Sequence, residues 1–151
     1  MVARPIRIRR GRRTDFTAVL QLLAGSGAAI PPPDRTALRR FRQLVADLGG
    51  DLYLATIDER IVGMAHVTYA RQLAEAPRAT LSTLVVEASQ RRRGIGTQLL
   101  RFAAARARQR ACARLHCTVV NDGTGPAADF LHHAGARPAG MQFEVSLFSE
   151  H

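Results

Sequence analysis

Apolar residues along the chain follow two spacings, one typical of strands and one typical of helices. Residues 6–9 alternate isoleucine with arginine, which predicts a short strand with one exposed face. Two runs with apolar residues three and four positions apart follow it, one starting at Thr14-Asp15 and one after Asp34. Each run ends at a glycine-rich segment. The beginning of the chain therefore predicts a strand followed by two helices.

The middle of the chain predicts three strands of one sheet. Residues 52–57 and 61–69 are strand-like, and the short polar turn between them favours a hairpin. Residues 79–86 alternate and then become continuously apolar, as in a strand that enters the covered part of a sheet. The remaining patterns predict a helix over 96–111, a strand over 115–120, a helix over 126–133 and a final strand over 141–147.

Length and composition set limits on the class of protein. The chain has 151 residues, of which 46% are hydrophobic, and no repeat or linker divides it, so we expect a single domain over residues 1–151. No apolar run reaches the ~20 residues that span a bilayer, and the arginine-rich start lacks the apolar stretch of a secretory signal. We therefore expect a cytoplasmic protein without a membrane partner. The two cysteines lack metal-ligand spacing, so no metal site is predicted.

The formal net charge is +10, and all 22 basic residues are arginine. An anionic partner would explain this excess, but so would the codon bias of a GC-rich genome, and both explanations stay open. A basic nucleic-acid-binding module is the alternative from another class. The aromatic residues are few and scattered, so they offer no platform on which bases could stack. We therefore expect no nucleic-acid partner.

The stretch SQRRRGIGTQLL, residues 89–100, lies where the patterns predict the passage from a strand to a helix. A helix that begins there leaves backbone N–H groups without partners inside the helix, and these groups together with the helix dipole form an anion site. Gly94 and Gly96 leave room for a bulky anion, and the three preceding arginines add positive charge. The stretch has neither the lysine of a Walker A loop nor the GxGxxG of a Rossmann fingerprint.

The spacing Arg91-x-x-Gly94-x-Gly96 resembles the [Gln/Arg]-x-x-Gly-x-[Gly/Ala] motif of the GNAT superfamily of acyl-CoA-dependent N-acetyltransferases. The predicted order of elements and the segment 127–138 are also similar to that family, so the resemblance covers nearly the whole chain. It implies an α/β GNAT fold, with a mixed, mostly antiparallel sheet of six to seven strands flanked by about four helices.

The resemblance also implies that acetyl-CoA is the cosubstrate. Its pantetheine arm would lie where the strands from Ala79 and Leu115 splay apart, and it would bind the backbone of Leu84, Val85 and Val86. The pyrophosphate would be held by Arg91, Arg92, Arg93, Gly94, Ile95, Gly96 and Thr97. Further cofactor contacts are expected from Asn121, Thr124 and Phe130; the family often has asparagine at the position of Thr124, and nearby Asn121 could replace it.

Amide formation needs an acceptor for the proton of the amine and a donor for the leaving thiolate. The family often has Glu or His at positions that match Thr80 and Ser82, and a tyrosine acid at the position of Leu131. The two hydroxyls are not bases near neutral pH, but each could order a water. Other candidates for the proton-accepting group are His116, Glu75 and Tyr69. His66 and His116 lie in predicted strands, where histidines are more often structural. Our catalytic candidates are Thr80, Ser82 and His116.

These features predict an N-acetyltransferase in which a primary amine of a small molecule or peptide attacks acetyl-CoA directly. A non-catalytic acyl-CoA sensor would share the fold. The amine is expected beneath residues 25–34, with residues 71–77 nearby. Because the chain after Gly135 is short, a homodimer in which a second subunit completes the site is a further expectation.

Overall fold

The structure is a computed structural model that describes residues 4–26, 30–119 and 124–148. The chain forms two compact units, Met1–Thr118 and Val119–His151. The first unit contains the sheet and three α-helices, and the second contains the fourth α-helix. Among the helices of the described residues, none has both the length and the apolarity that a membrane crossing requires.

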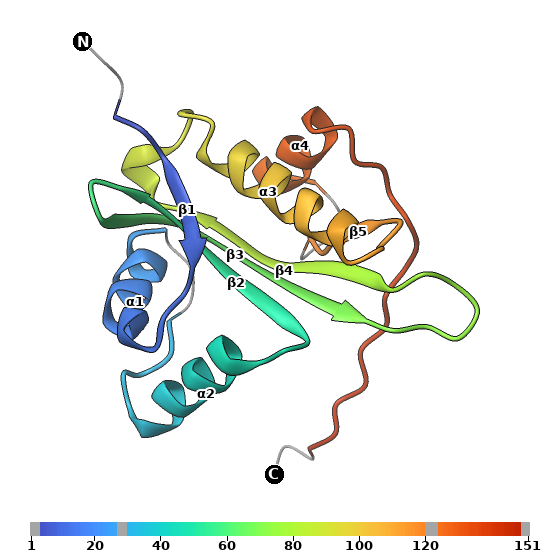
Figure 1. The fold of residues 1–151 in the computed structure, drawn as a ribbon, viewed down its shortest axis with the longest axis horizontal. Helices are drawn as coiled ribbons and strands as arrows, with labels where there is room; N and C mark the ends of the chain where they lie inside the picture. Colours follow the sequence, from blue (N-terminus) through green and yellow to red (C-terminus); the bar gives the residue numbers. More distant parts are fainter. Residues whose placement is uncertain (1–3, 27–29, 120–123, 149–151) are drawn as a thin grey trace. The chain divides into compact units, whose positions relative to one another are not determined.

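The first unit is built on a mixed sheet whose strands lie side by side in the order in which they occur in the chain (Figure 1). The first four strands pair antiparallel, and the fifth pairs parallel with the fourth. The strands are β1 (Arg7–Arg10), β2 (Gly50–Ile57), β3 (Arg60–Ala70), β4 (Arg78–Val86) and β5 (Leu115–Cys117). The mixed, mostly antiparallel sheet is confirmed. The expected number of six to seven strands is wrong, because the described residues form a five-stranded sheet.

The strand expected over residues 141–147 is the one that is missing. The structure places this segment outside any helix or strand, and its alternating apolar side chains are at least 79% exposed: Met141, Phe143, Val145 and Leu147. Alternation indicates that one face of a segment could be buried, but a strand also needs a neighbouring backbone to complete its hydrogen bonds. For the same reason β5 ends at Cys117, where its pairing with β4 stops, and not at residue 120 as expected.

Helices cover both faces of the sheet in the first unit (Figure 1). On one face, α1 (Phe16–Gly25) and α2 (Arg35–Ala46) enclose an apolar cluster that includes Leu54 of β2 and Met64 of β3. On the other face, α3 (Ile95–Gln109) packs over β2, β3 and β4 and buries a second apolar cluster. The two clusters give the sheet two different faces, one toward α1 and α2 and one toward α3.

Two aspartates stand at the starts of the first two helices, and of these Asp34 caps its helix with a side-chain hydrogen bond whereas Asp15 does not. The Asp34 carboxylate accepts a hydrogen bond from the Ala37 backbone N at 2.9 Å, which confirms it as the cap of α2. Asp15 lies in a short 3-10 turn before α1, where it accepts bonds from the Arg12 backbone N at 2.7 Å and from the Arg9 guanidinium at 2.8 and 2.9 Å. These bonds to Arg9 lower the pKa of Asp15 and tie β1 to α1.

α3 approaches the sheet closely because Gly63 of β3 lies beneath it. A Cβ atom at Gly63 would lie 3.0 Å from both Ile95 Cγ2 and Leu99 Cδ1, closer than packed side chains normally come. Both of these residues are buried. Since Ile95 is the first residue of α3, this contact fixes the position of the helix N-terminus over the sheet.

The second unit contains α4 (Pro126–His133), at the position that the sequence predicts. Pro126 occupies the first turn, where the missing N–H of proline costs no hydrogen bond. Gly135 follows the helix with a φ of +89°, and the Ala136 backbone N donates to Leu131 O at 2.9 Å. The helix therefore has the glycine-terminated end that the sequence indicates.

A buried carboxylate organises the polar part of the core. The Asp51 side chain is 0% exposed and accepts hydrogen bonds from Tyr53 Oη at 2.7 Å and from Tyr69 Oη at 2.9 Å. The Arg10 guanidinium also binds it, and Arg110 lies 4.2 Å from the centre of the Tyr69 ring. Burial raises the pKa of Tyr69 to about 12, so its hydroxyl stays protonated as a donor to Asp51. The cluster joins β1, β2, β3 and α3.

Replacing Asp51 by alanine is expected to lower the free energy of unfolding by about 3 kcal/mol, because the buried hydroxyl of Tyr53 and the partly buried hydroxyl of Tyr69 lose their acceptor. Urea unfolding at neutral pH measures this loss. The control is Asp58→Asn, which removes an exposed ion pair with Arg4, keeps a residue type that tolerates the φ of +49° at this position, and is expected to cost about 1 kcal/mol or less. Equal effects of the two variants would contradict the structural role of Asp51.

Candidate functional site

A bulge in β4 separates its two halves. Thr83 pairs with His66 of β3 and Leu81 pairs with Val67, so Ser82 is an extra residue without a partner on β3. On the opposite edge, β4 pairs with β5 only from Ala79 to Leu81. Beyond Leu81, β4 continues to Val86 with no strand of the described residues beside that edge. The backbone of β4 from Ser82 to Val86 therefore presents hydrogen-bonding groups to a ligand, as an edge strand does.

After β4 come a short 3-10 helix, η2 (Ala88–Gln90), and a turn that leads into the N-terminus of α3. The first hydrogen bond inside α3 runs from Gln98 N to Gly94 O at 3.0 Å, so the N–H groups of Ile95, Gly96 and Thr97 have no acceptor within the helix. Gly94 is the N-cap and has no side chain to satisfy them. Partial positive charge therefore gathers at this end of the helix, as expected for an anion site.

The backbone of this turn is shaped for an open concave site. Gly94 has a φ of +78° and Arg92 has a φ of +65°, and no heavy atom lies within 4 Å of a Cβ built on Gly94. The side chains of Arg91, Arg92 and Arg93 are exposed around it. Arg91 Nη2 also donates to Ser26 O at 3.1 Å, which links the turn to the end of α1. The residues expected to bind pyrophosphate are thus contiguous, and all of them except the buried Ile95 are at least partly exposed.

The three catalytic candidates from the sequence lie close together on one face of the sheet. Leu81 is 3% exposed and belongs to the cluster beneath α3, so its neighbours Thr80 and Ser82 face the other side. His116 pairs with Thr80 across the parallel β4–β5 ladder and faces the same side. The described residues therefore place Thr80, Ser82 and His116 next to the point where β4 and β5 separate.

His66 is the residue that the sequence analysis set aside as structural. Its Nδ1 lies 2.8 Å from Ser82 Oγ, and Ser82 Oγ lies 3.3 Å from the His66 carbonyl oxygen. Partial burial lowers the pKa of His66, while Asp47 acts in the opposite direction. The sequence shows a histidine in a predicted strand, but nothing in it indicates that a bulge brings Ser82 within hydrogen-bond distance of the imidazole ring.

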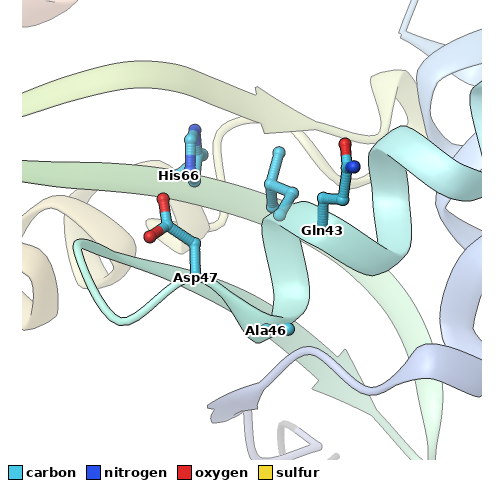
Figure 2. A pocket seen from close by; sticks show the side chains of 5 residues that line it. Gln43, Ala46, Asp47 and His66 are labelled. Carbon is cyan, nitrogen blue, oxygen red and sulfur yellow. The ribbon is translucent and has the colours of Figure 1, made fainter.

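Two hollows adjoin His66 on this face. One has a volume of about 180 Å³ between α1, α2 and the sheet, and it is lined mainly by apolar side chains, with His66 and Thr83 at the sheet. The other is an open hollow of about 520 Å³ beside the end of α2. Figure 2 shows the Asp47 carboxylate pointing toward His66 across this hollow. Residues 27–29 of the loop expected over the amine lie outside the described residues.

The other candidates fall in different parts of the chain. Thr124 and Phe130 belong to the second unit, with Phe130 on α4. Asn121 lies outside the described residues. Tyr69 donates to Asp51 in the core, and Glu75 is exposed in the segment between β3 and β4. Of these two alternative proton acceptors, Tyr69 is already committed to the polar core.

A mixed sheet that opens between two parallel strands, next to an uncapped helix N-terminus, defines an α/β protein with a site for an extended ligand that carries an anionic group. Residues 16–136 match the model of the acetyltransferase (GNAT) family. The chain therefore belongs to the GNAT family and is an acyltransferase, which confirms the resemblance seen in the sequence. No curated protein matches the chain.

Solved structures share the fold over nearly the whole chain. A transcriptional regulator from Bacillus halodurans C-125 has a TM-score of 0.84 and 24% identity, over 95% of this chain and 100% of its own. An aminoglycoside acetyltransferase from an uncultured soil metagenomic sample, in complex with sisomicin, has a TM-score of 0.75 and 19% identity, over 95% of this chain and 97% of its own. Glucosamine-6-phosphate N-acetyltransferase from Arabidopsis thaliana has a TM-score of 0.78 and 13% identity, over 95% of this chain and 99% of its own. At these identities the likeness shows the fold alone.

Gly94→Ala is expected to raise the Kd for acetyl-CoA, the donor that the family generally uses, by about tenfold, or ~1.4 kcal/mol of binding free energy. A Cβ at a φ of +78° is strained and displaces the N–H groups that follow. Melting temperatures measured against acetyl-CoA concentration give the Kd. The control is Gly140→Ala, at a φ of +141°, which introduces strain in the second unit. An unchanged Kd in Gly94→Ala would place the pyrophosphate elsewhere.

Proposed function

We propose that this protein transfers the acetyl group of acetyl-CoA to a primary amine of a small molecule or peptide by direct attack. The observation that carries the proposal is the unpaired edge of β4, which ends at the turn before α3. One ligand can therefore pair with a strand edge and place an anionic group on a helix N-terminus. Acetyl-CoA has this combination, because its pantetheine arm contains amides and its other end carries a pyrophosphate.

The cofactor contacts follow from this arrangement. Leu84, Val85 and Val86 would bind the pantetheine amides through the backbone, in the manner of an added strand. Residues 91–97 would hold the pyrophosphate through backbone N–H groups, with the arginines contributing charge. Asn121, Thr124 and Phe130 remain proposed contacts from the part of the chain after β5. That residues 1–151 act as a single domain also stays a proposal from the sequence.

Three arginines of β1 and β3 form ion pairs, which leave the net charge of +10 unchanged. Arg9 pairs with Asp15, Arg10 with Asp51 and Arg60 with Glu87. Several arginines of the basic N-terminal segment and the sheet therefore already have carboxylate partners. The proposal that the protein has no nucleic-acid partner rests on its few and scattered aromatic residues.

The apolar hollow supports a particular kind of amine. Its walls include Phe16, Leu20, Phe41 and Met64, and a cavity of about 150 Å³ with such walls is large enough for benzene. A hollow of about 180 Å³ would therefore accept a ring or a branched aliphatic group, but it offers few partners for the hydroxyls of a sugar. We propose an amine attached to an apolar group as the preferred acceptor.

The assembly and location of the protein stay proposals. The exposed apolar side chains of residues 141–148 support a homodimer, because exposed apolar rows of this kind mark interaction surfaces in soluble proteins. Sedimentation at micromolar concentration would show the mass of one chain or of two. The cytoplasmic location remains a prediction from the sequence.

Acetyl-CoA is expected to raise the melting temperature of the protein, and thiol release is expected on adding a suitable amine. At 100 times the Kd, one bound ligand contributes about 2.7 kcal/mol of stability. No stabilisation by millimolar acetyl-CoA would contradict the proposed donor. Stabilisation without thiol release from any amine would contradict transferase activity and favour the acyl-CoA sensor.

Among amines of different chemistry, 2-phenylethylamine is expected to show a kcat/KM about tenfold or more above those of glucosamine 6-phosphate, sisomicin and a short peptide with a free N-terminus. Burying its ring in the apolar hollow contributes ~1.5 kcal/mol or more. Leu20→Asp, which places a charge in the wall of the hollow, is expected to remove this preference. A higher kcat/KM for the sugar amines would contradict the assignment of the hollow as the amine site.

A further inference from the structure

The family positions for a general base are occupied here by Thr80 and Ser82, which cannot accept a proton near neutral pH on their own. An amine that attacks a thioester becomes positively charged at nitrogen and must lose a proton to complete the amide. A hydroxyl can carry that proton only when a second group accepts the hydroxyl's own proton at the same time. That second group has to lie within hydrogen-bond distance of one of these hydroxyls.

His66 meets that requirement. Ser82 Oγ lies 2.8 Å from His66 Nδ1 and 3.3 Å from the His66 carbonyl oxygen. The carbonyl oxygen can only accept a proton, whereas Nδ1 donates or accepts according to the tautomer; the relay uses the tautomer in which the hydroxyl donates to Nδ1 and the ring proton is on Nε2. The Ser82 oxygen then keeps lone pairs that can accept a proton from outside the pair.

The other side of the ring faces an open hollow. A Cβ on Gly50 would lie 3.5 Å from Nε2, so the absence of a side chain there leaves space at this edge of the ring. The charged side chains that line the two hollows together with His66 are Asp47 and Arg40, both contributed by α2 and its C-terminal cap. Asp47 points toward His66, as Figure 2 shows, and favours a positive charge on the ring. A proton gained at Nδ1 can therefore be released from Nε2 to water.

Ser82 is also well placed with respect to the reaction. It is the bulged residue of β4, exposed on the face opposite α3, and it stands where β4 leaves β5. The next residue, Thr83, lines the apolar hollow together with His66. An amine that enters from this hollow toward the edge of β4 therefore passes His66 and Thr83, and Ser82 precedes Thr83 on the strand.

We propose that Ser82 and His66 form a proton relay that removes the proton of the attacking amine. This inference rests on the proposed acetyl transfer and deepens it by naming the proton acceptor. In this relay Ser82 acts through an imidazole and not through a water, and His66 takes the part that the sequence suggested for His116.

The proton balance of the step is complete without a further reactant. The amine nitrogen forms a bond to the thioester carbonyl carbon, and the C–S bond breaks with its electron pair moving to sulfur. One proton passes from nitrogen to Ser82 Oγ, while the hydroxyl proton of Ser82 passes to His66 Nδ1. The imidazolium releases the Nε2 proton to water in the open hollow, and the CoA thiolate takes a proton from water. The products are the acetamide and free CoA.

The relay requires a neutral imidazole before the reaction. Burial lowers the pKa of His66 from 6.5, so the ring is neutral at pH 7 and becomes protonated as the pH falls. Activity that depends on His66 should therefore be lost on the acidic side. The ionisation of the amine also affects activity, but it cancels in a ratio of two enzymes measured with the same amine.

The experiment compares the wild-type protein with His66→Gln, using as probe whichever amine of the four above releases thiol fastest. The kcat of His66→Gln is expected to fall about 100-fold with the KM for acetyl-CoA unchanged, as for the loss of a general base. The ratio of wild-type to variant kcat/KM is expected to rise with pH and level off, with a midpoint below pH 6.5. His133→Gln makes the same change at an exposed histidine of α4 and should leave kcat unchanged.

Two further variants separate proton transfer from a structural role. Added imidazole is expected to restore part of the activity of His66→Ala, which a histidine that only holds the bulge would not allow. Ser82 is exposed, so Ser82→Ala should fold, and its kcat is expected to fall as in His66→Gln, whereas Ser82→Thr keeps the hydroxyl and most of the activity.

A wild-type kcat in Ser82→Ala, or a ratio of kcat/KM that does not change with pH, would overturn the relay while leaving the transferase intact. Absence of thiol release by the wild-type protein with all four amines would instead contradict the proposed function. Stabilisation of each variant by acetyl-CoA shows that the cofactor site is folded in every case, so the two failures are distinguishable.

Discussion

The backbone of β4 has strand partners on both edges only as far as Leu81, and the candidate site follows from that constraint. A strand inside a sheet has no hydrogen-bonding groups left for a ligand, whereas a strand that loses one neighbour exposes a row of them. Because β5 is short, β4 has no neighbouring strand of the described residues on that edge after Leu81. The bulge at Ser82 lies at the same level on the other edge, which pairs with β3. The same few residues thus open the sheet and turn a hydroxyl toward the face opposite α3.

Close packing then brings a second feature to the end of this edge. Because Gly63 has no side chain, the first turn of α3 packs closely against the sheet. The free N–H groups at the start of the helix therefore lie near the end of β4. Neither feature alone would select acetyl-CoA, because strand edges and helix N-termini bind many ligands. Their succession along one strand and turn is what supports a ligand with amides at one end and a pyrophosphate at the other.

Polar side chains on the two faces of the sheet differ in burial and in their number of hydrogen-bond partners. Toward α3, the Asp51 carboxylate is fully buried and bound by two tyrosines, and the largely exposed Arg10 binds it from the edge of the core, so this network stabilises the fold. Toward α1 and α2, His66 is only partly buried and binds a single exposed serine beside two hollows. A titratable group with one partner and access to water can exchange protons, whereas one enclosed by partners cannot. The proton chemistry therefore belongs to the second face.

The sequence by itself determined the family and most of the elements, because apolar spacing reports burial and the Arg91–Gly96 spacing reports a backbone turn. Both are local properties. It failed for residues 141–147, where alternation indicated a strand but pairing depends on a neighbour that local pattern cannot supply. It also failed for His66, whose partner Ser82 is sixteen positions away and reaches the ring only because β4 carries an extra residue. Which strand edge stays open and which hydroxyl meets an imidazole were decided by the tertiary structure, since both depend on strand register.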